Sequence, residues 1–335
     1  SAAVAGGITY VTGAQRGQLT IFAFDGNGKQ TWRTAHGPSW SRSYPGGRST
    51  PTIDEGRLYL LSGPGRVACY DAATGREQWA REMSEFGGSP GGWGFAESVL
   101  IVDDMAVVTP GGRNCMVALD KKTGRTRWES AGNGGAAHYG SAIHIASRGA
   151  EMIVGSSRDG LFAVRPRDGR VLWTNGFSAG NTANCTTPVY ADGRLFWANG
   201  YGRGGICLRV STSSAREDWR TRDMVCHHGG YIVHDGHIYG NHNNGWSCIE
   251  LSSGDTRWQE RGVGKGSLCF ADGMLILFSE RGGEAALAKA SPAGLNITGR
   301  VRMPGSGQSW AHPVVAGGRL YLRYASNLTC FNIKR

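Results

Sequence analysis

The sequence lacks any apolar run long enough to cross a membrane. A membrane-spanning helix needs about 20 consecutive apolar residues, and glycine or charged residues interrupt this 335-residue chain well before that length. The chain begins Ser1-Ala2-Ala3-Val4, with no basic stretch and no long apolar segment behind it. We therefore expect no membrane span and no signal peptide in this chain, as in a mature secreted protein.

Concentrated charge and paired cysteines are also missing. Lys and Arg number 36 against 26 Asp and Glu, a net charge of +10, but no basic run is longer than two residues. This scattered pattern predicts a solvated basic surface and no nucleic-acid partner. The eight cysteines form no CxxC pair and no Cys/His spacing of a zinc site. Cys69, Cys248 and Cys330 lie in apolar segments, so we expect small buried thiols and assign no metal ligands.

Glycine, by contrast, is abundant. Its 54 residues, together with 11 tryptophans, predict many short strands joined by tight turns. One phrase recurs along the chain, most clearly as Ala118-Leu119-Asp120-Lys121-Lys122-Thr123-Gly124 followed by Trp128. Comparable copies end at Trp32, Trp79, Trp173, Trp219 and Trp258. With Trp128 included, consecutive tryptophans of the repeat stand 39 to 49 residues apart. The chain therefore consists of repeated units of about this length.

The repeated unit fits a four-stranded blade of a β-propeller. Helical periodicity is absent, and the clearest copies place an Asp and a Gly in the turn before the strand that carries Trp. The predicted second strands lie near Ile8, Leu58, Met105, Met152, Leu195, His237, Met274 and Leu320. We predict one all-β domain over residues 1–335, an eight-bladed propeller with seven four-stranded blades and one incomplete blade. Seven blades with an irregular closure is the alternative.

The phrase Ala-x-Asp-x-x-Thr-Gly-x-x-x-Trp resembles the tryptophan-docking motif of the pyrroloquinoline-quinone-like propeller repeat family. The closing stretch from Trp310 to Arg323 resembles single-domain, BamB-like members of bacterial origin. The resemblance implies a periplasmic or extracellular protein. Quinone-dependent dehydrogenases of this family hold their cofactor beside two adjacent cysteines, with a calcium bound by Glu and Asn. This chain has no adjacent cysteines, so we expect neither bound quinone nor another cofactor.

The candidate site lies in the long loops that join the fourth strand of one blade to the first strand of the next. These loops place polar and aromatic side chains near the starts of the innermost strands, at one predicted channel mouth. Five of the nine histidines fall in or beside them: His36, His138, His227, His228 and His312. The candidate ligand-binding residues are Arg48, Trp93, Asn184, His228, Lys265, Trp310 and His312.

Three functions are compatible with these residues. The first is a propeller that binds an acidic or neutral glycan, with Arg48 and Lys265 on a carboxylate and the tryptophans on sugar rings. The second is a carbohydrate-active enzyme such as a lyase, whose catalytic residues are His138, Tyr139, His227 and Arg48. The third is a BamB-like scaffold that binds a protein partner. A divalent metal at the histidine-rich mouth stays open, and we expect a monomer.

Overall fold

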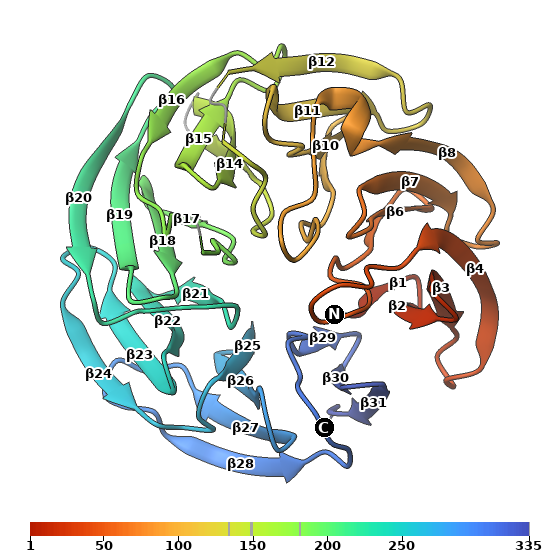
Figure 1. Cartoon of the computed structure of the whole chain (residues 1–335). Helices are drawn as coiled ribbons and strands as arrows, with labels where there is room; N and C mark the ends of the chain where they lie inside the picture. The colour runs from red at the N-terminus through yellow and green to blue at the C-terminus, as the bar shows by residue number, and fades with distance from the viewer. Residues whose placement is uncertain (133–134, 148–149, 181, 335) are drawn as a thin grey trace. The chain divides into compact units, whose positions relative to one another are not determined.

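Hydrogen-bonded antiparallel sheets account for nearly all the regular structure of the chain. A computed structural model describes residues 1–132, 135–147, 150–180 and 182–334. Each sheet contains strands that are consecutive in the sequence and pair in that order (Figure 1). Within these residues the helical structure is a single 3-10 turn, η1 (Met83–Phe86), and no helix is long and apolar enough to cross a membrane.

The chain divides into two compact units, and each is described by itself. Unit 1 contains Ser1, Cys185–Val210 and the residues from Arg216 on, whereas unit 2 contains Ala2–Asn184 and Ser211–Ala215. The sheets of unit 2 comprise β1–β4 (Ala3–Ala5, Ile8–Gln15, Gln18–Phe24 and Gln30–Pro38), β5–β8 (Thr52–Asp54, Arg57–Leu61, Arg66–Asp71 and Glu77–Glu82), β9–β12 (Leu100–Val102, Met105–Val108, Asn114–Asp120 and Thr126–Ala131) and β13–β16 (Ile143–Ser147, Ala150–Ser157, Gly160–Val164 and Val171–Asn175).

Unit 1 holds the remaining four sheets. They comprise β17–β20 (Val189–Ala191, Arg194–Asn199, Gly204–Val210 and Ala215–Thr221), β21–β24 (Tyr231–His234, His237–His242, Gly245–Glu250 and Thr256–Glu260), β25–β28 (Gly266–Ala271, Met274–Ser279, Glu284–Lys289 and Ile297–Arg302) and β29–β31 (Val314–Ala316, Arg319–Tyr324 and Asn327–Asn332). Seven four-stranded sheets and one three-stranded sheet confirm the predicted all-β, eight-bladed β-propeller.

The recurring tryptophan joins consecutive sheets within a unit. Trp128 in β12 is buried, and its Nε1 donates to the Pro166 carbonyl of the next sheet at 2.7 Å. Gly169 lies under the indole with φ +71°, and a Cβ added there would come within 2.4 Å of the ring. Trp79 and Gly124 repeat this arrangement. The tryptophan thus needs both a carbonyl and a bare glycine in the following blade, which explains why the motif recurs as a unit.

The Asp of the motif shapes the turn that presents this glycine. Asp71 Oδ1 accepts hydrogen bonds from the backbone of Ala73 and Thr74 and from the Thr74 hydroxyl, at 2.8–3.1 Å. The Thr74 hydrogen bonds hold the pKa of Asp71 below its usual value. Gly75 then adopts φ +72° and donates its N–H to the Asp71 carbonyl. A short polar side chain and a glycine are what such a turn requires.

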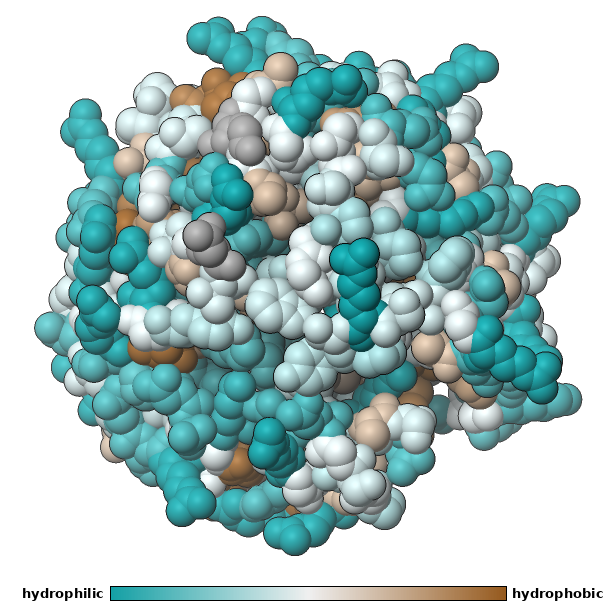
Figure 2. Space-filling model, in the orientation of Figure 1, coloured by the Kyte–Doolittle hydropathy of each residue, from teal (hydrophilic) through white to brown (hydrophobic). Residues whose placement is uncertain are grey.

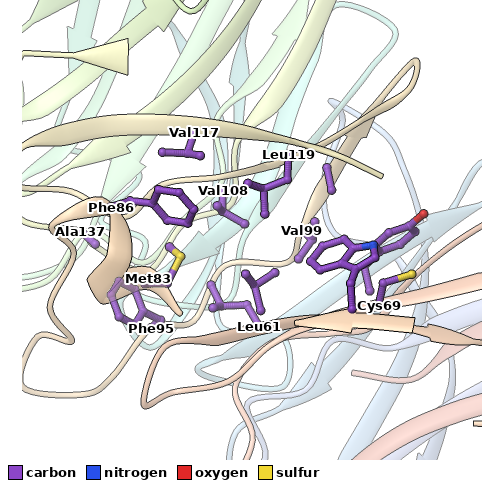
Figure 3. Close-up of a cluster of buried hydrophobic side chains, with 14 residues drawn as sticks. Leu61, Cys69, Met83, Phe86, Phe95, Val99, Val108, Val117, Leu119 and Ala137 are labelled. Carbon is purple, nitrogen blue, oxygen red and sulfur yellow. The ribbon is translucent and has the colours of Figure 1, made fainter. Parts of the chain in front are cut away.

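Apolar side chains from neighbouring sheets form the core between them. In unit 2, Leu61 and Cys69 pack with Val108 and Leu119 of the next sheet, and Phe86 of η1 closes the cluster (Figure 3). Alternation of inward and outward residues along each strand produces this packing. Five cysteines are buried in such positions, as predicted.

Cys330 departs from that prediction because its thiol is exposed. It lies on β31, the last strand of the three-stranded sheet, where no fourth strand covers it.

The surface seen in Figure 2 is predominantly hydrophilic, with apolar residues scattered over it. Many arginines of the described residues pair with acids, as Arg127 does with Asp104 and Asp120. This agrees with the predicted solvated basic surface.

Candidate functional site

The connections that carry the candidate residues lie at one end of each sheet. In a four-stranded antiparallel sheet, the turn between the second and third strands lies at the same end as the loop that leaves the fourth strand. Within each unit, first strands of successive sheets are neighbours. We call this end of each sheet the loop end. Both kinds of connection can therefore contribute side chains to one surface.

Unit 2 brings four predicted residues together at its loop end. The His138 and Tyr139 rings stack with centroids 5.3 Å apart, and Trp93 meets Tyr139 edge to face at 5.8 Å. His138 Nδ1 accepts the backbone N–H of Asn184 at 3.0 Å, and Tyr139 donates its own N–H to the Asn184 carbonyl. Burial, followed by the nearby Arg158, lowers the pKa of His138 to about 4. The imidazole is therefore neutral at neutral pH.

Asn184 and Arg48 direct most of their hydrogen bonds to the backbone, and Asn184 Nδ2 also donates to the Ser178 hydroxyl at 3.0 Å. Asn184 is fully buried, with Oδ1 accepting from the Ala179 N–H and Nδ2 donating to the Ser157 carbonyl, both at 2.9 Å. The Arg48 guanidinium donates to the carbonyls of Ser43, Tyr44 and Gly46 at 2.8–3.3 Å. These two side chains shape the loops in which they lie.

Glu97 is a buried carboxyl in the same unit. It is 2% exposed, and Thr109 donates to it twice, from its N–H at 2.6 Å and from its hydroxyl at 2.5 Å. Burial raises the pKa of Glu97 to about 7, against the opposing effect of the two Thr109 hydrogen bonds.

His36, expected beside a loop, lies instead in β4. Its ring contacts the Tyr70 hydroxyl and the Arg66 carbonyl.

Unit 1 brings another four predicted residues together, around Glu280. One Glu280 oxygen accepts the indole N–H of Trp310 at 3.0 Å, and the other lies 3.1 Å from the Lys265 ammonium. Lys265 also lies 3.2 Å from His227 Nδ1. His227 Nε2 in turn lies 2.9 Å from the Tyr201 hydroxyl. A hydrogen-bonded chain therefore runs from Trp310 through Glu280, Lys265 and His227 to Tyr201.

His228 packs inside this cluster. Its ring lies 4.7 Å from that of His227 and 5.6 Å from that of Trp310. Both ring nitrogens are buried and make no hydrogen bond with the described residues, although Nε2 is 3.8 Å from Glu280. Burial is the main cause that lowers the pKa of His227 to about 4 and that of His228 to about 2. Both rings are neutral at neutral pH, and Glu280 offsets the Lys265 charge.

His312 lies next to this cluster but binds backbone. Its ring nitrogens lie 3.2 Å from the Leu268 carbonyl and 3.0 Å from the His228 carbonyl. A neutral imidazole has one N–H and can donate to only one of them. Its backbone N–H donates to the Ser1 hydroxyl. His312 therefore connects the segment before β29 to the preceding sheets.

The sequence analysis missed Tyr201 and Glu280. Both lie in connections between second and third strands, Tyr201 after β18 and Glu280 after β26. The prediction from sequence covers only the loops after fourth strands, although both kinds of connection share the loop end. A Glu directly after the apolar strand Met274–Ser279 was the available signal.

Asn199, which ends β18, is fully buried, and neither of its amide atoms has a hydrogen-bond partner among the described residues.

The residues of these clusters do not fit a quinone with its calcium. No two cysteines are adjacent in the sequence, and Glu280 is already bound by a lysine and an indole. Within the described part of the chain, the hydrogen-bond partner of Glu97 is Thr109, and no second carboxylate is paired with it. Among residues 1–132, 135–147, 150–180 and 182–334, no three His, Cys, Asp or Glu side chains are grouped to hold a metal ion.

Comparisons with known proteins agree with the repeat. The family model described as outer membrane protein assembly factor BamB matches residues 15–260. The crystal structure of BamB from Moraxella catarrhalis superimposes with a TM-score of 0.74, covering 98% of this chain and 95% of that one at 16% identity. Quinohemoprotein alcohol dehydrogenase from Comamonas testosteroni gives 0.69, covering 96% of this chain and 69% of that one at 13% identity. The comparison with curated proteins finds no match.

Proposed function

Because this chain belongs to the family of the outer membrane protein assembly factor BamB, we propose that it is a non-catalytic scaffold that binds a protein partner at the loop end of unit 1. The observation that carries the proposal is a pair of exposed aromatic rings beside the Glu280 cluster. Tyr201 is 52% exposed and Trp310 37% exposed. We call Tyr201, His227, Lys265, Glu280 and Trp310 the aromatic surface.

Hydrogen bonds inside the aromatic surface hold both exposed rings in position. The Trp310 indole is tied to Glu280 and the Tyr201 hydroxyl to His227. Side chains that are fixed before binding lose little conformational entropy when a partner docks. Tyrosine and tryptophan are also the residue types that contribute most to protein interfaces. A periplasmic location, with no bound quinone, completes the proposal.

Photo-crosslinking in the organism that encodes the chain tests this function. A benzophenone amino acid is placed at position 201, at position 310 and, as a control, at the exposed Tyr44 of unit 2. We expect the same crosslinked polypeptide, identified by mass spectrometry, from positions 201 and 310 and not from 44. Equal labelling at all three positions, or no crosslinked polypeptide at 201 and 310, contradicts the proposal.

A glycan is the second candidate ligand. Exposed Tyr201 and Trp310 offer flat faces for sugar rings, and the hydrogen-bonding groups between them suit hydroxyls. Because Glu280 offsets the charge of Lys265, this surface suits a neutral glycan better than an acidic one. Calorimetric titration with cellohexaose and with an oligogalacturonate compares the two.

The same mixtures test the lyase alternative. Cleavage of the oligogalacturonate by elimination gives an unsaturated product that absorbs in the ultraviolet. Absorbance that grows with time, and is lost in Tyr139→Phe or His227→Ala, would favour the enzyme. A tight cellohexaose complex together with no crosslinked polypeptide would favour the glycan-binding protein.

A further inference from the structure

Two arginines of unit 2 lie against one buried indole, in the loop that joins β4 to β5. The Trp40 side chain is 5% exposed. The guanidinium carbons of Arg42 and Arg48 lie 5.5 and 5.6 Å from the centroid of its ring, within the range of a cation–π contact. Such a contact positions each charge but does not neutralise it, because the ring carries no net charge. The loop therefore holds two positive charges on one side chain.

Bare glycines from two other connections hold this indole in place. A Cβ added at Gly63, in the turn between β6 and β7, would lie 2.9 Å from Trp40 Cβ, and one added at Gly94 would lie 3.0 Å from the ring. The indole N–H donates to the Ser43 carbonyl at 3.2 Å. The support under the two arginines is thus fixed before any ligand arrives, which reduces the entropy lost on binding.

No carboxylate of the described residues pairs with these two charges. The sequence contains no Asp or Glu between Asp25 and Asp54, and Asp54 itself pairs with Lys121 at 2.7 Å. Arg48 directs its hydrogen bonds to loop carbonyls. Arg42 is exposed, and its contact within the described part of the chain is the one with Trp40. Two uncompensated guanidinium groups held together favour an anionic ligand.

A further aromatic side chain lies beside the arginines. Trp93 precedes Gly94, the glycine that packs on Trp40, and its ring meets Tyr139 edge to face at 5.8 Å. Burial lowers the pKa of Arg48, and nearby Tyr139 opposes that effect. Tyr139 is therefore a neighbour of both Arg48 and Trp93. The Trp93 side chain is partly exposed, so it offers apolar surface next to the two charges.

We propose that Arg42, Arg48 and Trp93 form a binding site for an acidic saccharide, a sugar that carries a carboxylate. Arg42 donates to the carboxylate, Arg48 adds its charge while it holds the loop, and the Trp93 ring packs against the C–H face of the sugar. The guanidinium fork matches the two oxygens of a carboxylate, and an indole suits the apolar face of a sugar. This site does not rest on the proposed function, which concerns the aromatic surface of unit 1.

Calorimetric titration of the full chain with tetragalacturonate tests the ligand class. The fully methyl-esterified tetrasaccharide keeps the sugar rings and lacks the charges, whereas tetraglutamate keeps the charges and lacks the rings. We expect tetragalacturonate to bind, and to bind more weakly as salt rises. Each of the two control ligands should bind at least tenfold more weakly, because each lacks one of the two features that the site recognises.

A matched pair of variants tests the role of Arg42. Arg42→Gln should weaken tetragalacturonate binding about tenfold, the loss expected for one hydrogen bond to a charged group. Arg125→Gln is the control. Arg125 is another exposed arginine of unit 2, in the turn before β12 and so at the opposite end of its sheet from the loop end. It removes the same charge and should leave the affinity unchanged. Circular dichroism checks that both variants fold.

NMR of the indole N–H groups places the saccharide on the protein. The Trp93 signal, identified by its loss in Trp93→Phe, should shift saturably with tetragalacturonate, whereas the Trp310 signal should not.

Four results would each overturn the inference: an unmoved Trp93 signal, equal affinity for tetraglutamate, equal affinity for the methyl ester, or equal losses in Arg42→Gln and Arg125→Gln. Crosslinking at positions 201 and 310 is unaffected by any of them, so the proposed function and this inference can fail separately.

Discussion

Replacing Gly169 by alanine should destabilise the protein because the new methyl group would collide with Trp128. A Cβ at this position would lie 2.4 Å from the indole, and Gly169 has φ +71°. The conformation alone costs alanine about 1 kcal/mol. Displacement of the packed indole adds about 1–3 kcal/mol, and loss of its 2.7 Å bond to Pro166 adds about 1 kcal/mol. We expect a total loss of about 3–5 kcal/mol.

Gly56→Ala is the matched control. Gly56 lies in the same unit with φ +73°, and an added Cβ there meets no atom within 4 Å. It should lose about 1 kcal/mol, from the conformation alone. Urea unfolding of both variants, followed by far-ultraviolet circular dichroism, gives the comparison. Equal losses would show that the glycine serves the turn and not the tryptophan, and the account of the repeat would be wrong.

Four further predictions follow from individual residues. Trp128→Ala should lower the unfolding free energy by about 3–5 kcal/mol, measured in urea. The pKa of Glu97 is raised, so the stability it contributes is complete below its unfolded pKa and is lost as pH rises through about 7. Glu97→Gln should therefore unfold like the parent at pH 4 but be more stable by about 3 kcal/mol at pH 8, and equal stability at pH 8 would contradict the raised pKa. His36 is held neutral with a pKa of about 4, so its contribution should be lost as pH falls from 6.5 towards 4, and His36→Gln should flatten that part of the pH–stability curve. Pyrroloquinoline quinone with calcium should produce no dye-linked alcohol oxidation. Stoichiometric quinone in the purified protein would contradict the inference that a chain without adjacent cysteines binds no quinone.

The fold could be predicted because its determinants are local and repeated. The Asp120, Thr123 and Gly124 turn and the tryptophan it serves have counterparts every 39 to 49 residues, so one copy reveals the others. The incomplete last blade followed from the same count. Exposure of Cys330 did not, because an apolar strand sequence does not reveal that its neighbour strand is missing.

The candidate site could be predicted only in part. His227, Lys265 and Trp310 lie in or beside the long loops and were predictable there. Tyr201 and Glu280 were not, because the short connections between second and third strands carry no repeat. Asn184 and His312 were grouped with the site because their residue types suit ligands. In the structure the same groups bind backbone, and a sequence does not distinguish these two uses.

Co-purification from the organism that encodes the chain tests the central claim most directly. Four forms are compared: the parent, Tyr201→Ala, Trp310→Ala and, as a control on unit 2, Tyr44→Ala. The account predicts that the polypeptide crosslinked at position 201 accompanies the parent and Tyr44→Ala, and is strongly reduced with the other two. Undiminished recovery with both Tyr201→Ala and Trp310→Ala would contradict a partner site on the aromatic surface.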